Sequence, residues 1–239
     1  MIKLLSTRRL PPTMATFEPK CDKNIFKLAQ NGDIAGVEGL IEEGHGVNEV
    51  DAMGSTPLIL AARNGHVSLV KILLGQGATV EAATYGGMRA LHFAANALEE
   101  PTIIALLEEG KADINAPDGE GQGAIHWAAS RGVLGTIVVF VDHGADINMV
   151  SGTKTTPLMR AVANSHGGVV QRLLKLNAKH DQADVDGNTA LHLACRGQSA
   201  DIVEALLAAG ADKGAKNKLN KTPQECTTDA LVLQCFPAE

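Results

Sequence analysis

Histidines are the residues of this sequence best suited to chemistry, because an imidazole near neutral pH can move protons or bind a metal ion. The chain contains eight of them. Five fall into two sets that recur along the chain, with His92, His126 and His192 in one set and His66 and His166 in the other. A catalytic group is needed once, whereas a structural group recurs with a repeat. We therefore interpret these five side chains as structural hydrogen-bonding groups.

Other motifs associated with catalysis are missing or lack their structural context. The sequence has no H-E-x-x-H motif, no phosphate-binding loop and no nucleophile elbow. A glycine-rich segment at 119–123 is not framed by the strand and the helix that a dinucleotide site needs. Adjacent glutamates, as at Glu108-Glu109, diverge on a helix and indicate a solvated face. We therefore expect that the chain is not an enzyme and that it has no catalytic residues and no cofactor.

The four cysteines are too few for a disulfide framework in a chain of 239 residues. Their spacing also matches no zinc-binding pattern. Cys195 lies among alanines, where a thiol behaves as a small buried apolar side chain. We expect free thiols in a reducing compartment and no metal site. The expected localisation is cytoplasmic, with the nucleus as the second choice.

Composition narrows the class of partner. The formal net charge of -6 argues against a wide basic face for nucleic acid. No apolar run reaches the roughly 18 residues that a membrane-spanning helix needs. Hydrophobic residues make up 45% and aromatic residues 3%, so aliphatic and alanine side chains must form the core. Residues 1–20 are expected to be a flexible tail, whose basic residues Lys3, Arg8 and Arg9 are faintly similar to a transit peptide.

A period of 33 residues organises most of the chain. Apolar residues keep this spacing, with one interval of 34, at Ile25, Leu58, Leu91, Ile125, Leu158 and Leu191. Glycine or asparagine keeps the same intervals at Gly44, Gly77, Gly110, Gly144, Asn177 and Gly210. Two residue classes that share one spacing over such a length indicate an internal repeat. The interval of 34 requires one extra residue, for which Lys111 is the expected site.

Each period carries the same series of local signals. A turn with glycine, as in Asp51-Ala52-Met53-Gly54, is followed by a threonine and a proline, which favour the first turn of a helix. A short alanine-rich helix then ends near a glycine such as Gly65. A second helix carries a pair of large apolar residues, as in Leu73-Leu74. Each period therefore predicts one turn and two short helices.

The motif that opens each period resembles the T-P-L-H-x-A motif of ankyrin repeats, whose period is also 33. It appears as Thr56-Pro57-Leu58-Ile59-Leu60-Ala61, Ala90-Leu91-His92-Phe93-Ala94, Ala124-Ile125-His126-Trp127-Ala128 and Ala190-Leu191-His192-Leu193-Ala194. The resemblance implies an all-α solenoid of stacked helix-turn-helix units with short β-hairpin-like turns. It implies one domain over 21–239, with a cap at 21–50, repeats at 51–83, 84–117, 118–150, 151–183 and 184–216, and a C-terminal cap at 217–239.

Several positions depart from the repeat pattern. Arg89 and Gly123 stand where a threonine caps the first helix in other repeats, and Leu98 stands where a glycine is expected to end one. Pro101 is expected to begin the second helix of its repeat. In the last repeat Gln224 replaces leucine, which suits the polar outer face of a terminal repeat. These departures affect the expected local geometry and not the expected fold.

The resemblance also implies protein binding, through the turn tips and the exposed side of the first helices on a concave face. Trp127 and Tyr85 are the only tryptophan and tyrosine of the chain, and both map to this face. Such side chains often dominate binding, although Phe93 and Trp127 could instead be partly buried against a neighbouring helix. The predicted binding residues are Arg63, Tyr85, Met88, Phe93, Glu120, Trp127, Arg131, Arg160, Asp186 and Arg196.

The leading hypothesis is a non-catalytic scaffold or adaptor that binds another protein or an extended peptide. A more specific form of this hypothesis is that the peptide is acidic. We expect a monomer that binds neither a membrane nor nucleic acid. The number of repeats is also similar to that of gankyrin-type assembly chaperones or regulatory subunits. A third alternative is the ankyrin module of a larger enzyme, as in ankyrin-bearing acyltransferases, and the complete gene would test it.

Overall fold

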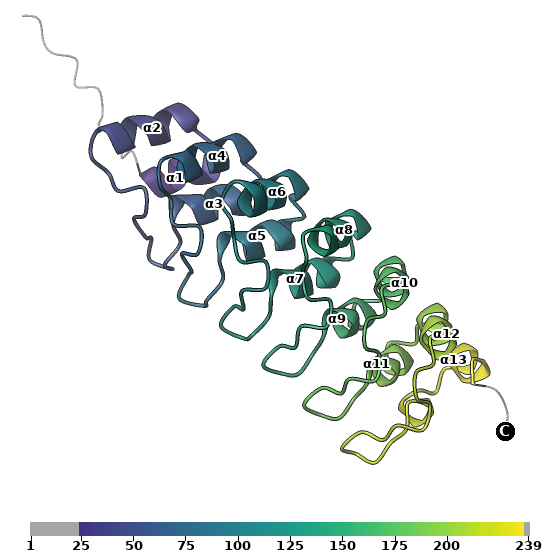
Figure 1. Ribbon diagram of the computed structural model, residues 1–239. Helices are drawn as coiled ribbons and strands as arrows, with labels where there is room; N and C mark the ends of the chain where they lie inside the picture. The colour runs from purple at the N-terminus through teal and green to yellow at the C-terminus, as the bar shows by residue number, and fades with distance from the viewer. Residues whose placement is uncertain (1–23, 237–239) are drawn as a thin grey trace, which may run out of the picture.

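The computed structural model describes residues 24–236 as a row of short helices stacked side by side (Figure 1). Within these residues six pairs of helices follow one another along the chain. The first helices of the pairs are α1 (Ile25–Asn31), α3 (Pro57–Arg63), α5 (Ala90–Ala97), α7 (Ala124–Arg131), α9 (Pro157–Ala163) and α11 (Ala190–Arg196). The second helices are α2 (Ile34–Glu42), α4 (Val67–Gly75), α6 (Glu100–Glu108), α8 (Leu134–Asp142), α10 (Gly167–Lys175) and α12 (Ala200–Ala208). A 3-10 helix η1 (Gln224–Cys226) and α13 (Ala230–Gln234) complete the row.

The first and second helices form two layers, and long loops project to one side of the row (Figure 1). First helices contact the first helices of neighbouring repeats, and second helices do the same in their own layer. Among the described residues there is no strand, and a single isolated bridge pairs Ala83 with Arg89. The expected all-α stack is therefore confirmed. The expected tail at 1–20 and Cys21 lie outside the described residues.

Small side chains allow the first helices to pack closely. One alanine position recurs in five of these helices, and it has no solvent exposure in any of them: Ala61, Ala94, Ala128, Ala161 and Ala194. A methyl group at this position lets neighbouring backbones approach, and a larger side chain would force them apart. Large residues come instead from the second helices, where Leu73, Leu106 and Phe140 are fully buried between the layers. The alanine-rich motif of the sequence is thus a packing requirement.

The first helices begin in two different ways. At α3 the side-chain oxygen of Thr56 accepts a hydrogen bond from the N–H of Ile59 at 3.3 Å, as is usual for a helix cap. At α5 no threonine is present, and the N–H of Arg89 donates to Nδ1 of His92 at 3.1 Å. Helix α7 begins in the same way at Gly123. A histidine inside the helix therefore satisfies the N–H of the residue that precedes the helix, and His192 does the same for Thr189 at α11.

At several helix ends a residue other than glycine adopts the left-handed conformation. Leu98 ends α5 with φ 65°, the left-handed conformation that Gly132 adopts at the end of α7. A residue with a β-carbon pays about 1–2 kcal/mol in this region. After α6, Lys111 adopts φ 54° and Gly110 does not have a positive φ, in line with the expected extra residue. Pro101 is the second residue of α6, which begins at Glu100, one residue before the expected start.

Six turns extend from the row of helices, and we call them fingers: 51–55, 84–88, 118–122, 151–155, 184–188 and 217–221. Each finger is tied to the next by a backbone hydrogen bond, from the N–H of Tyr85 to the carbonyl of Met53 at one end and from Lys218 to Asp186 at the other. The first residue of a finger holds its own loop. The carboxylate of Asp118, for example, accepts the N–H groups two and four residues later, at 2.8 and 2.9 Å. The fingers are therefore fixed relative to one another.

Candidate binding surface

The recurring histidines are occupied by the framework. In His92, His126 and His192, Nδ1 accepts the backbone N–H three residues earlier, and Nε2 lies 3.0–3.1 Å from a carbonyl oxygen of the next finger. Burial lowers the pKa of His92 and of His126 below the ordinary value of 6.5. A neutral imidazole is the form that can accept at Nδ1 and donate at Nε2. The structural interpretation of these three histidines is therefore confirmed.

Each histidine of the second set joins its own repeat to the one before it. Nε2 of His66 lies 2.9 Å from the carbonyl oxygen of Gln30, and Nε2 of His166 lies at the same distance from that of Ser130. A β-carbon at Gly132 would come within 2.2 Å of the ring of His166, so only glycine fits beneath the ring. These histidines also act in the framework, as the sequence predicted.

The fingers and the exposed parts of the first helices form a common surface, which we call the inner face. One helix position runs along its centre, and it holds Leu60, Phe93, Trp127, Arg160 and Leu193 in successive repeats. The two leucines are buried, whereas the three central side chains are half-buried. The centre of the inner face is therefore a partly exposed strip of large side chains that rests on the core.

The two half-buried aromatic rings are held by their neighbours. Nε1 of Trp127 donates to the carboxylate of Asp118, a finger residue of the same repeat, at 3.0 Å. The guanidinium of Arg63 lies 5.9 Å from the centre of the Phe93 ring, a distance at which a cation is attracted to the ring face. Both rings also pack against the buried core. Partial burial, the alternative considered for these rings, is what the structure shows, and each ring still has an exposed part.

The most exposed apolar side chains of the N-terminal fingers lie on adjacent fingers. Tyr85 is 80% exposed and Met53 is 70% exposed. The N–H of Tyr85 donates to the carbonyl of Met53 at 3.1 Å, so the two tips are joined. Met88, at the other end of the same finger as Tyr85, is half-buried. The sequence named Tyr85 and Met88 as binding residues, but only the structure shows that Met53 is the exposed partner of Tyr85.

The predicted arginines differ in solvent exposure and share a lack of ion pairs with the described acidic residues. Arg63, Arg131 and Arg196 are exposed, and Arg160 is half-buried with no hydrogen-bond partner for Nε in the described part of the chain. None of the four forms an ion pair with a described acidic residue, whereas Arg89 pairs with Glu81 at 3.0 Å. These arginines lie along most of the length of the inner face, which also carries the acidic residues of the fingers.

The two predicted acidic residues lie on separate fingers. Glu120 is exposed, and its carboxylate accepts the side-chain amide of Gln122 at 3.0 Å. Asp186 is exposed and lines a hollow between the last two fingers. The structure therefore does not bring all ten predicted residues to one spot; it distributes them along the row.

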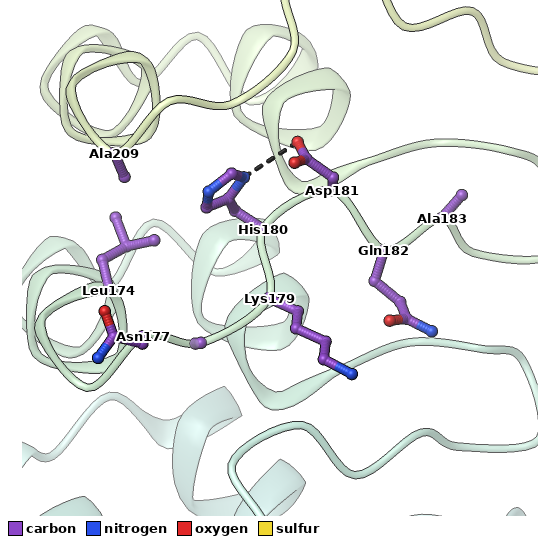
Figure 2. Close-up of a pocket in the computed structure, with 9 residues that line it drawn as sticks. Leu174, Asn177, Lys179, His180, Asp181, Gln182, Ala183 and Ala209 are labelled. Carbon is purple, nitrogen blue, oxygen red and sulfur yellow. Dashed lines mark ion pairs between the residues drawn. The ribbon is translucent and has the colours of Figure 1, made fainter.

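A larger hollow than the one beside Asp186 lies between the loop after α10 and the end of α12, with a volume of about 800 Å³ (Figure 2). Figure 2 shows His180 and Asp181 side by side, with Leu174 and Ala209 beside the imidazole. Nδ1 of His180 lies 3.0 Å from the carboxylate, which also accepts the N–H of Asp212 at 3.2 Å. The residues that line the hollow include no serine, threonine, cysteine or tyrosine, so the imidazole has no hydroxyl or thiol to activate there.

The described residues contain neither a metal-binding cluster nor a membrane-spanning helix. Over 24–236, no three histidine, cysteine or acidic side chains lie close enough together to hold a metal ion. Over the same stretch, no helix has the length and apolar character to cross a membrane.

Burial raises the pKa of the Cys195 thiol to about 12, which keeps it protonated.

Comparison with known proteins gives a consistent family assignment. A family model described as ankyrin repeats matches three overlapping stretches, 25–118, 96–184 and 125–217. The mouse B-cell lymphoma 3 protein homolog is 32% identical over 185 residues, which are 74% of this chain and 41% of that protein. The human palmitoyltransferase ZDHHC13 is 32% identical over 208 residues, which are 85% of this chain and 33% of that protein. The chain thus spans less than half the length of these curated relatives.

Solved structures show the same fold. The ankyrin repeat domain of Bcl-3 superposes with a TM-score of 0.77 at 28% identity, over 88% of this chain and 96% of that one. The human ASB11 ankyrin repeat domain superposes with a TM-score of 0.79 at 24% identity, over 90% of this chain and 98% of that one. The second likeness concerns the fold alone.

Proposed function

We propose that this chain, which belongs to the ankyrin-repeat family, is a non-catalytic scaffold that binds a partner protein on its inner face. Ankyrin repeats are generally protein-binding modules, but a fold does not identify a partner. The observation that carries the proposal is the pair of exposed tips, Met53 and Tyr85, on two fingers joined by a backbone hydrogen bond. An exposed aromatic ring beside an exposed methionine is typical of an interface and is not explained by packing.

The framework supports this proposal because it fixes the surface before a partner arrives. The first residue of each finger holds its own loop, and each finger is bonded to the next. The side chains at the tips are therefore presented at fixed positions, so little backbone freedom is lost on binding. Beyond the tips, the half-buried strip around Trp127 and the free guanidinium of Arg131 would extend the contact along the row.

The test removes the tips without disturbing the core. We expect a Met53→Ala/Tyr85→Ala variant to bind the partner about 30-fold more weakly or worse, because truncation of interface aromatics often costs about 2 kcal/mol of binding free energy. The partner is first identified by affinity capture with the unmodified chain and mass spectrometry, and its affinity is then measured by calorimetry. The matched control is Leu231→Ala, which removes a side chain that is 65% exposed on α13.

A loss of affinity counts only if the variants keep the fold of the unmodified chain. Both variants should melt at the temperature of the unmodified chain, because the removed side chains are exposed. Equal affinity of the double variant and the Leu231→Ala control would contradict binding through the fingertips. We further propose that the chain is a monomer in the cytoplasm or nucleus, which light scattering and microscopy of the tagged chain would check. Turnover of a small molecule by the purified chain would contradict a non-catalytic role.

One finding favours a second candidate function, that of an ankyrin module within a larger enzyme. The human palmitoyltransferase ZDHHC13 matches 85% of this chain, while the match covers 33% of that protein. A module of this kind would bind the substrate protein for an attached acyltransferase region. Sequencing the complete transcript tests this candidate directly: an acyltransferase region in frame with the repeats would support it, and a transcript that ends with the repeats would remove it.

A further inference from the structure

A hollow of about 340 Å³ lies on the inner face between the last two fingers, and we call it the C-terminal hollow. The positively charged side chains that line it are Arg196 from the end of α11 and Lys218 and Lys221 from the last finger. Asp186 is the acidic residue of its lining. All four residues are exposed, and none of them forms an ion pair within the described part of the chain. The lining of the hollow therefore holds three cations and one carboxylate, and Glu225 lies near Lys221 in an adjoining hollow.

The floor of the C-terminal hollow is rigid. The side-chain amide of Asn217, which is buried, donates to Oδ1 of Asn188 at 2.9 Å. The same side chain accepts the N–H groups of Leu219 and Lys221 at 3.0 and 3.1 Å. Nε2 of His192 lies 3.0 Å from the carbonyl oxygen of Lys221. The backbone that carries the two lysines is thus held from several sides, and their ammonium groups extend from a fixed base.

The positive charge is specific to this end of the molecule. Lys213, Lys216, Lys218 and Lys221 lie within 213–221, a stretch without any acidic residue, in a chain whose formal net charge is -6. The two finger positions that carry Lys218 and Lys221 hold no cation in any of the other five fingers. Charges gathered on one part of an acidic protein attract a partner of opposite charge and orient it.

An apolar side chain accompanies these charges. Leu219, at the tip of the last finger, is 77% exposed and lines the same hollow. Like Met53 on the first finger, it occupies the third finger position, which points away from the core. A ligand that fills the hollow would therefore meet an apolar surface next to the cations, which suits an amphipathic polypeptide better than a purely ionic ligand.

We propose that the C-terminal hollow binds an acidic segment of a partner protein, with a carboxylate between Arg196 and Lys221 and an apolar side chain against Leu219. The inference rests on the proposed function and names the chemistry of one part of the partner. An acidic polypeptide is favoured over a small inorganic anion because Leu219 offers an apolar contact beside the three cations. Nucleic acid is disfavoured because a phosphate chain that ran on along the row would meet the exposed Glu120.

The test uses a defined probe, an end-capped six-residue peptide in which glutamates flank one leucine. It is titrated into the isotope-labelled chain, and the backbone amide signals are followed by NMR. We expect saturable shifts at Lys218, Leu219 and Lys221. A Lys218→Glu/Lys221→Glu variant should weaken binding by about tenfold or more, because two attractive charges become repulsive. A Lys175→Glu/Lys179→Glu variant makes the same change in net charge away from the hollow, and its affinity should stay within about twofold.

Several results would overturn the inference. They are shifts that do not saturate, equal binding of a peptide with glutamine in place of glutamate, and equal weakening by the two double variants. Tighter binding of a matched phosphoserine peptide or of a single-stranded oligonucleotide would replace the carboxylate with a phosphate ligand. The variant side chains are exposed, and an unchanged melting curve excludes unfolding as the cause of any loss.

The two proposals fail separately. If a captured partner is lost by Met53→Ala/Tyr85→Ala and retained at full affinity by Lys218→Glu/Lys221→Glu, the proposed function stands and the acidic segment is refuted. If the glutamate peptide saturates the C-terminal hollow while no captured protein depends on the fingertips, fingertip binding fails and the chemistry of the hollow is supported.

Discussion

His126 joins two repeats, and its removal should destabilise the stack measurably. Its side chain is fully buried. Nδ1 accepts the N–H of Gly123 at 3.1 Å, and Nε2 lies 3.1 Å from the carbonyl oxygen of Thr155 in the next finger. His126→Ala leaves both backbone groups without these partners, and each buried unpaired group costs about 1–3 kcal/mol. We therefore expect the free energy of unfolding to fall by about 2–4 kcal/mol at neutral pH, a large share of the stability of a typical domain.

The same substitution should matter less in acid. Burial lowers the pKa of His126 in the folded chain below 6.5, so the unfolded chain binds the proton more readily. The stability of the unmodified chain is therefore complete above the unfolded value and decreases as the pH falls below it, by at most about 1.4 kcal/mol per pH unit for one group. The variant lacks this group. The difference between the two proteins should shrink by up to about 1.4 kcal/mol when the pH falls from about 6.5 to about 5.5.

Urea unfolding followed by circular dichroism measures both effects. The control is His143→Ala, which removes an exposed histidine at the end of α8. The hydrogen bond to the carbonyl of Val139 raises the pKa of His143, so any effect of this control should be small and should decline as the pH rises. The reasoning would be refuted if His126→Ala lost less than about 1 kcal/mol at neutral pH, or if its deficit stayed constant or grew in acid.

Two further predictions concern single residues. Lys154→Gly should raise the free energy of unfolding by about 0.5–1 kcal/mol in the same urea titration. The reason is that Lys154 is exposed and adopts φ 58°, at the finger position where Gly54, Gly121 and Gly187 stand in other repeats. An unchanged or lower stability would show that the lysine is not strained. Cys195 should not react with iodoacetamide near pH 8 in the folded chain, because burial raises its pKa to about 12. Rapid alkylation of Cys195 in the folded chain, located by peptide mass mapping, would contradict its burial.

The helical framework could be predicted from the sequence because each repeat must satisfy the same local and neighbouring contacts. The alanines that let the first helices approach recur at one position, and so do the histidines that bond to the next finger. A contact that is repeated in space leaves a residue type that is repeated in the chain. Departures were less predictable: the repeat register placed Leu98 where a glycine is expected, but only the structure shows that the leucine keeps the left-handed conformation of the glycine. There the stacking of adjacent repeats overrides the preference of the residue.

The binding surface depended more on tertiary structure. The sequence placed Trp127 on the inner face, but its half-buried position and its hydrogen bond to Asp118 follow from how a finger folds back on its own helix. It did not single out Leu219, whose exposure depends on the loop that Asn217 holds.

The repeat period, the paired helices and the structural histidines were thus readable in the chain alone, because neighbouring units impose identical requirements on every repeat. Which variable side chains gather into one surface was decided by the stack. The C-terminal hollow illustrates the difference, since Arg196 and Lys221 lie on separate elements and line one space only when two repeats pack together. A contact that forms between one pair of repeats alone is not repeated along the row, so it leaves no periodic trace in the sequence.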